Sequence, residues 1–168
     1  MAEAAFLPSR RIALRLGGLG ALGLLASCTT SRVLLPETGT GEDQTEAMLA
    51  AVNALRGKKG LAPLEADPKA RAAALDQAAR MARAGRMEHN IGFGADFGKR
   101  MNGQGVTLPA AENIASGQRE AARAFQAWVD SPKHLANMLG RPYRGLGVAV
   151  ARNPVSGERP YWAMVLSG

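Results

Sequence analysis

The chain has a single cysteine, Cys28, and two histidines, His89 and His134, among its 168 residues. One cysteine cannot form a disulfide within the chain, so the fold must be stabilised by its hydrophobic core in any redox compartment. A long run of lysine or arginine is also absent, although Lys and Arg outnumber Asp and Glu by 21 to 14. This modest basic excess suits an anionic envelope surface as well as nucleic acid.

The sequence also has no apolar run long enough to cross a bilayer. The apolar stretch from Leu16 to Ala26 is shorter than the ~20 residues that a spanning helix needs. It follows Ser9-Arg10-Arg11 and leads into Leu25-Ala26-Ser27-Cys28. A basic head before a short apolar core is typical of a cleaved export signal. The alternative interpretation is a buried helix with an incidental cysteine.

Two parts of this segment resemble known export signals. The arginine pair resembles a twin-arginine signal, with Ala13 where a bulkier apolar residue is usual. The stretch that ends at Cys28 resembles the lipobox of bacterial lipoproteins, which implies that Cys28 carries lipid and becomes the first mature residue. We therefore expect residues 1–27 to be a signal peptide and the protein to be exported and held at a membrane through Cys28. Export makes nucleic acid a poor partner, while the export route and the membrane leaflet stay open.

The rest of the chain divides into a tether and one domain. Residues 28–44 are polar and contain Pro36, Gly39 and Gly41, a composition typical of a flexible linker. Residues 45–168 are numerous enough for one domain with its own core. Helical periodicity comes first and alternating strand patterns come last, which favours an α+β fold over a parallel α/β sheet.

The predicted helices span about residues 42–56, 68–84 and 117–130, with short helical turns near 96–101 and 132–138. The second has the clearest boundaries, because Asp67-Pro68 is a helix start and Gly85 a helix stop. Its predicted buried stripe contains Leu75, Ala78 and Ala82.

A hairpin is predicted at the end of the chain. Leu146, Val148 and Val150 alternate with smaller residues, residues 153–157 form a turn, and residues 161–166 return.

Residues that could carry chemistry occur in three short motifs. They are Met87-Glu88-His89, then Glu112-Asn113-Ile114-Ala115, then a block from Ala127 to Leu139 that contains Trp128, Ser131-Pro132, His134 and Asn137-Met138. In this order, and followed by Gly145-Leu146-Gly147-Val148-Ala149 and Tyr161-Trp162, they resemble the bacterial branch of the CAP superfamily. The superfamily is named after cysteine-rich secretory, antigen 5 and pathogenesis-related 1 proteins.

The resemblance covers about Thr45 to Leu166. It implies an α-β-α sandwich, with a small antiparallel sheet between helical layers, and a surface cleft that contains His89, Glu112 and His134. Ser131 and Asn113 complete the set of residues expected to bind a ligand there. Ser131 stands where family members often have a second glutamate, so the expected cleft has fewer carboxylates.

Three roles for this cleft are open on sequence alone, and no catalytic residue is assigned. Zinc takes histidine nitrogen and carboxylate oxygen, so His89, Glu112 and His134 could hold a zinc ion with one position open for water, as in a hydrolase. A second hypothesis is a module that binds a lipid, glycan or protein of the envelope. The third is a structural protein, in which Glu112 bonds to a histidine and Ser131 caps the helix of His134. We favour the binding module, because a shared fold does not by itself indicate a reaction.

Overall fold

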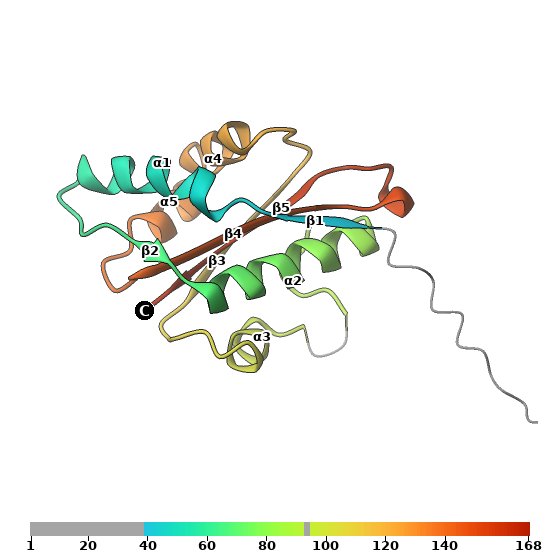
Figure 1. The fold of residues 1–168 in the computed structure, drawn as a ribbon, viewed down its shortest axis with the longest axis horizontal. Coiled ribbons are helices and arrows are strands. Elements are labelled where there is room, and N and C mark those ends of the chain that lie inside the picture. The colour runs from blue at the N-terminus through green and yellow to red at the C-terminus, as the bar shows by residue number, and fades with distance from the viewer. Residues whose placement is uncertain (1–38, 93–94) are drawn as a thin grey trace, which may run out of the picture. The chain divides into compact units, whose positions relative to one another are not determined.

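A central, mostly antiparallel sheet organises residues 39–92 and 95–168, which are the residues that the computed structural model describes (Figure 1). The elements in chain order are β1 (Thr40–Asp43), α1 (Thr45–Gly57), β2 (Glu65–Ala66), α2 (Pro68–Ala84), α3 (Phe97–Gly103), β3 (Ala111–Ser116), α4 (Ala121–Val129), α5 (Pro132–Met138), β4 (Gly145–Arg152), the 3-10 turn η1 (Pro154–Ser156) and β5 (Tyr161–Ser167). The strand order is β1-β4-β5-β3, and the short β2 pairs in parallel with β4. The predicted signal, Cys28 and the tether up to residue 38 lie outside the described residues.

The hairpin of β4 and β5 confirms the predicted C-terminal strands and contributes to two separate cores. Leu146, Val148 and Val150 face one core together with Trp162, whereas Ala149 faces the other. Successive side chains of a strand point to opposite faces, so one hairpin can line both cores. In Figure 1, α1, α4 and α5 lie on one side of the sheet and α2 and α3 on the other. This is the expected α-β-α sandwich.

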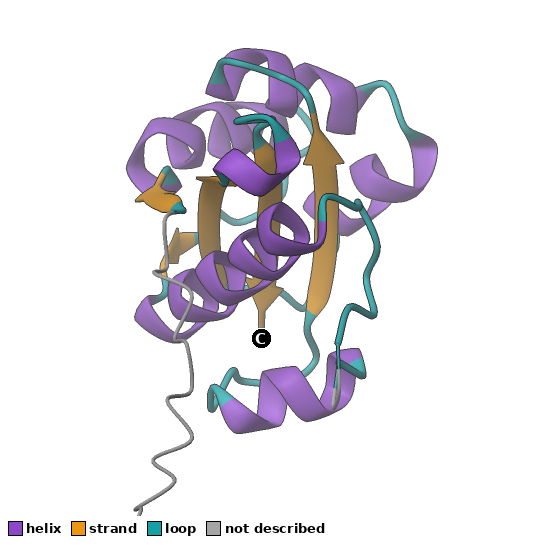
Figure 2. Cartoon of the chain, turned by 90° about the vertical axis from the view of Figure 1, so that its right-hand side faces the viewer, coloured by secondary structure: helices purple, strands orange, loops and turns teal. Residues whose placement is uncertain are grey.

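Helix α2 packs closely on the sheet because the facing side chains are small. Its buried face consists of Ala70, Ala73, Ala74, Gln77, Ala78, Met81 and Ala82. Opposite it, Gly147 of β4 has no room for a side chain, since an added Cβ would overlap the backbone of Ala70 and Arg71. Figure 2 shows α2 crossing in front of the strands. Both cores lie wholly within residues 39–168, so this part of the chain contains the contacts that its own folding needs.

The predicted boundaries of α2 are confirmed. The Asp67 side chain accepts a hydrogen bond from the backbone N–H of Lys69 at 2.8 Å, Pro68 is the first helical residue, and Gly85 has φ 64°. Asp67 thus satisfies a backbone donor that the helix leaves free, and Gly85 adopts a left-handed conformation that costs other residues more.

The prediction that Leu75 belongs to the buried stripe of α2 is wrong. Leu75 is 38% exposed and lies over Gly41 of β1, where an added Cβ would come within 2.6 Å of its Cδ1. Each helical residue turns by about 100°, so the stripe that contains Gln77 and Met81 leaves Leu75 at its margin.

Two helices begin later than predicted. Residues 40–43, expected to end the tether and start the first helix, form β1 instead, and α1 begins at Thr45. Helix α4 begins at Ala121 rather than near Gly117, because the backbone N–H of Gly117 bonds to the carbonyl of Pro160 in line with the sheet. The short helices α3 and α5 form where turns were predicted. Within the described part of the chain, no helix is both long and apolar enough to cross a membrane.

Candidate functional site

Adjacent residues of β3 point to opposite faces of the sheet and divide the predicted cleft residues into two groups. Glu112 pairs with Val165 and bonds to His89 and Arg100 on the side of α2 and α3. Asn113 faces the other way and bonds to the backbone of His134 in α5. The two histidines therefore contact neighbouring residues of the edge strand β3 from opposite sides of the sheet.

Glu112 forms a buried ion pair with Arg100 of α3. The Nη1 of Arg100 lies 2.9 Å from Oε2 of Glu112, and its Nη2 lies 3.0 Å from Oε1. The two side chains are only 3% and 2% exposed. Further donors of Arg100 reach the backbone carbonyls of Ala95 and His89, each at 3.2 Å. A carboxylate taken out of water needs such a partner, and Arg100 supplies it through two parallel hydrogen bonds.

His89 is a partly exposed residue that bonds to the buried Glu112–Arg100 pair. Its Nδ1 lies 2.8 Å from Oε1 of Glu112, while its side chain is 51% exposed. The amide of Gln77 donates to the carbonyl of Glu88 at 2.7 Å, and so holds the loop after α2 in place. A carboxylate accepts hydrogen bonds, so Nδ1–H of His89 is the donor in this contact and Nε2 is the ring nitrogen left for another partner.

An open hollow of about 320 Å³ lies beside this imidazole. It is lined by His89, Asn90, Asp96, Phe97 and Glu112. Asp96 begins α3, and its Oδ1 accepts the backbone N–H of Lys99 at 3.1 Å. The hollow thus combines a phenyl ring, an imidazole, an amide and two carboxylates, which come from residues 89–90, the start of α3 and β3.

His134 is in the first turn of α5, near enough to His89 for the two rings to influence one another. Burial lowers the pKa of His134 below its ordinary value, and the nearby His89 lowers that pKa further. Within the described residues, the buried Nδ1 of His134 has no hydrogen-bond partner. The ring is therefore held in its neutral form.

Asn113 and Ser131, the other predicted cleft residues, have different roles. Asn113 donates to the carbonyl of His134 at 3.0 Å and accepts from the amide of Asn137 at 2.8 Å, so it fixes α5 against β3. Ser131 is the N-cap residue immediately before α5, but its side chain makes no capping hydrogen bond, so the predicted capping role is not observed. It joins neither the His89–Glu112 contact nor the Asn113 bridge.

Comparison with known proteins identifies the family. The family model described as CAP, the cysteine-rich secretory protein family, matches residues 49–166. The chain belongs to this family. A search of curated proteins gave no match.

Solved CAP structures share the fold. A Bacillus anthracis extracellular protein containing an SCP domain has a TM-score of 0.65 and 22% identity, over 74% of this chain and 40% of that one. An outer surface protein of Borrelia burgdorferi has a TM-score of 0.63 and 22% identity, over 77% of this chain and 97% of that one. A Staphylococcus aureus cysteine-rich secretory protein has a TM-score of 0.57 and 18% identity, over 74% of this chain and 38% of that one. This chain thus spans about two fifths of the first of these proteins.

The described structure does not group the predicted zinc ligands into a metal site. His89, Glu112 and His134 were predicted as zinc ligands, but the described residues contain no group of three or more His, Cys, Asp or Glu side chains that could hold a metal. Both oxygens of Glu112 already bond to Arg100, whose positive charge would repel a second cation. Arg100 thus takes the place beside Glu112 that a metal would need.

Sequence reasoning did not identify Arg100, whose guanidinium bonds to both carboxylate oxygens of Glu112. The signal that could have suggested such a residue is Glu112 itself, since a carboxylate between apolar strand residues needs a cationic partner. The buried carboxylate indicates that an arginine or lysine lies nearby, but it does not identify the residue. Arg100 comes close to Glu112 only because of how α3 packs.

Proposed function

We propose that this protein is an exported, lipid-anchored CAP domain that binds a hydroxyl-rich glycan of the cell envelope through the hollow at His89. The observation that supports this function most is the lining of the hollow. His89, Asn90 and Asp96 offer acceptors and donors beside the ring of Phe97. Sugar hydroxyls both donate and accept hydrogen bonds, and the apolar faces of sugar rings pack on aromatic rings.

The rigidity of the imidazole also favours a binding role. His89 is tied to Glu112, which is tied to Arg100, and Arg100 also holds the His89 carbonyl. A polar group that is fixed before binding loses less conformational entropy when a ligand arrives. The same chain of contacts disfavours a metal-dependent hydrolase, because it occupies the carboxylate that such an enzyme would use.

Export and anchoring are supported by the sequence. The basic head, the short apolar core and the lipobox-like stretch ending at Cys28 occur in the order that a lipoprotein signal requires. A CAP domain held by lipid would be kept beside envelope polymers, which raises their effective concentration at the hollow.

Calorimetric titration of residues 29–168 with soluble cell-wall glycan fragments tests the binding role. We expect saturable binding that His89→Ala weakens about tenfold or more, as the loss of one good hydrogen bond implies. Asp96→Asn should also weaken binding, whereas Lys58→Gln on α1, outside the lining of the hollow, should leave it unchanged.

Three outcomes would contradict the glycan proposal. Binding that does not change in His89→Ala would place the glycan elsewhere on the surface. Saturable binding of a lipid or a protein in place of glycan would give the hollow a different ligand. The absence of any ligand would assign the His89–Glu112–Arg100 contacts to stability alone, which is the structural alternative that their burial favours.

A further inference from the structure

A second hollow, of about 500 Å³, lies beside the tip of the β4–β5 hairpin and is lined by arginines. Its lining residues are Gly117, Arg119, Arg152, Gly157, Glu158, Arg159 and Pro160. They come from the end of β4, the hairpin turn and the loop before α4. The lining thus includes three arginines and one acidic residue, Glu158.

Most of this positive charge is not neutralised by neighbouring carboxylates. Arg152 pairs with Glu42 at 3.0 Å, whereas among the described residues the guanidinium of Arg159 donates only to the hydroxyl of Ser116, at 3.3 Å. Arg119 forms no ion pair within the described residues. Arg119 and Arg159 therefore remain available to an external anion.

An exposed apolar side chain lies at the tip of the same hairpin. Val155 of η1 is 81% exposed, the largest value among the exposed large hydrophobic residues of the described chain. A single exposed valine is common on protein surfaces, but at this tip it stands beside the arginine-lined hollow, where it could be buried in an apolar phase that the arginines contact.

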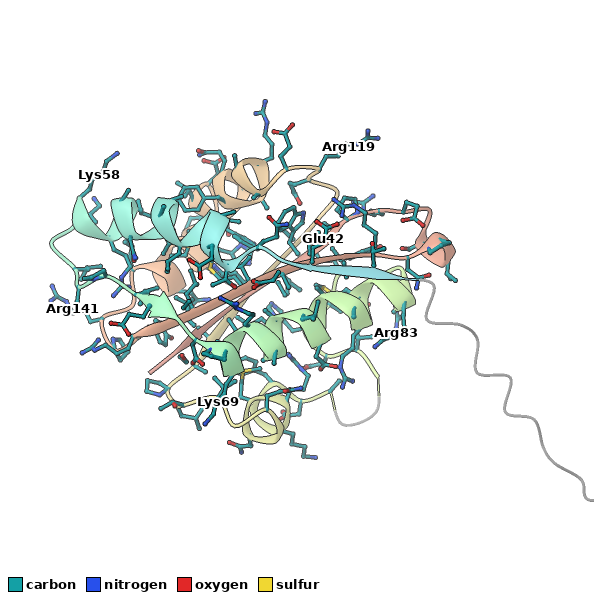
Figure 3. The ribbon with its side chains drawn as sticks, in the orientation of Figure 1. Glu42, Lys58, Lys69, Arg83, Arg119 and Arg141 are labelled. Atoms are coloured by element: carbon teal, nitrogen blue, oxygen red, sulfur yellow. The ribbon has the colours of Figure 1, made fainter. Side chains whose placement is uncertain are left out.

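The chain from the predicted anchor arrives at this end of the domain. Thr40 of β1 pairs with Arg152 of β4, so Gly39 lies directly beside the hairpin tip. Figure 3 shows Arg119 and Arg83 towards the end where β1 begins, and Lys58 and Arg141 at the opposite end. The eleven residues from Cys28 to Gly39 can span at most roughly 40 Å, so a lipid on Cys28 would keep this end near the bilayer.

We propose that this end of the domain docks on an anionic phospholipid bilayer, with Arg119, Arg152 and Arg159 on headgroup phosphates and Val155 in the interface. Arginine binds phosphate oxygens through parallel N–H donors, and an anionic surface attracts each basic residue placed against it. The docking goes beyond glycan binding and rests on the proposed function only for the anchor that orients the domain. It would hold the domain in one orientation, where a tether alone would let it rotate.

Sedimentation of residues 29–168 with phospholipid vesicles tests the docking surface without the lipid anchor. Vesicles of equal phosphatidylglycerol and phosphatidylcholine should bind the protein, and vesicles of phosphatidylcholine alone should not. Arg119→Gln with Arg159→Gln should lower the partition coefficient about twenty-five-fold, since each basic residue contributes about fivefold. Lys58→Gln with Arg141→Gln removes the same charge from the opposite end and should lower it less than threefold.

Two further variants test the geometry of the contact. Val155→Ser should reduce binding about tenfold or more, because fully burying a valine side chain is worth about 1.5 kcal/mol or more. Glu158→Gln should strengthen binding, since it removes the carboxylate that opposes the phosphates. All of these side chains are exposed, so circular dichroism should show an unchanged fold.

Three results would overturn the proposal. They are no binding by the wild-type chain, equal losses in the two double variants, and displacement by millimolar inorganic phosphate but not by chloride at equal ionic strength. The last would assign the hollow to free phosphate. Loss of vesicle binding with glycan binding at His89 intact would separate failure of this inference from failure of the proposed function.

Discussion

The guanidinium of Arg100 and the carboxylate of Glu112 form two parallel hydrogen bonds in the interior, between α3 and β3. Replacing Arg100 with leucine would leave the Glu112 charge buried without its partner. We expect Arg100→Leu to lower the free energy of unfolding by roughly 3–5 kcal/mol, measured by urea denaturation. Leucine at both positions should recover much of that loss, because it removes both charges. A loss below about 1 kcal/mol in the single variant would contradict this account.

The same ion pair leads to a prediction about zinc. Arg100 occupies both oxygens of Glu112, so we expect calorimetry at micromolar concentrations to show no saturable zinc binding by residues 29–168. The variants His89→Ala, Glu112→Ala and His134→Ala should behave like the wild type in this titration. Tight binding that all three variants lose would show instead that the cleft rearranges around a metal.

His134 makes the stability of the domain depend on pH. Its pKa is lowered in the folded protein, by burial first and by His89 second. The unfolded chain therefore binds a proton that the folded chain resists, and stability falls as pH drops from about 6.5 through the lower folded pKa. His134→Gln should lose this dependence, so the difference in urea midpoint between the two proteins should change between pH 7.5 and 5.

Parallel curves for wild type and His134→Gln over this range would show that protonation of His134 does not act on stability. Above about pH 7 the contribution of the neutral ring is fully present, so the two curves should run parallel there.

The export signal gives a prediction in cells. Cys28→Ser should release the protein from membranes into a soluble fraction, because the residue that carries lipid is lost. Lysine at Arg10 and Arg11 should block export if the twin-arginine route is used. Cell fractionation and the mass of the mature N-terminus measure both effects, with Thr30→Ala as a control. An unchanged membrane fraction in Cys28→Ser would contradict lipidation at this residue.

The features that the sequence predicted well depend on neighbouring residues. Asp67-Pro68 and Gly85 bound α2 because capping is decided within a few residues. The alternation of Leu146, Val148 and Val150 likewise marks β4 without reference to the rest of the chain. Sequence reasoning could therefore place these elements, whereas the α-β-α sandwich was expected from the family resemblance.

The features that it missed depend on contacts between distant segments. The residues of β1 are all exposed and contain glycine and acids, so they show no strand pattern and are held by backbone pairing with β4. Arg100 lies in α3 and Glu112 in β3, with a loop between them, so no helical or strand periodicity in the sequence predicts their contact. The histidines and Glu112 were identified from a family motif, but that motif does not include Arg100, which bonds to both oxygens of Glu112.

The close contact between α2 and β4 gives the last prediction. A Cβ on Gly147 would overlap the backbone of Ala70 and Arg71, and backbone cannot move aside as a side chain can. Gly147→Ala must therefore push α2 away from the sheet, which we expect to cost about 1–3 kcal/mol or more in thermal denaturation. Gly57→Ala at the end of α1 is the matched control, since nothing lies within 4 Å of the added atom. If the two variants were equally stable, the separation of α2 from β4 would have to be greater than described here, and the alanine face of α2 would lose its explanation.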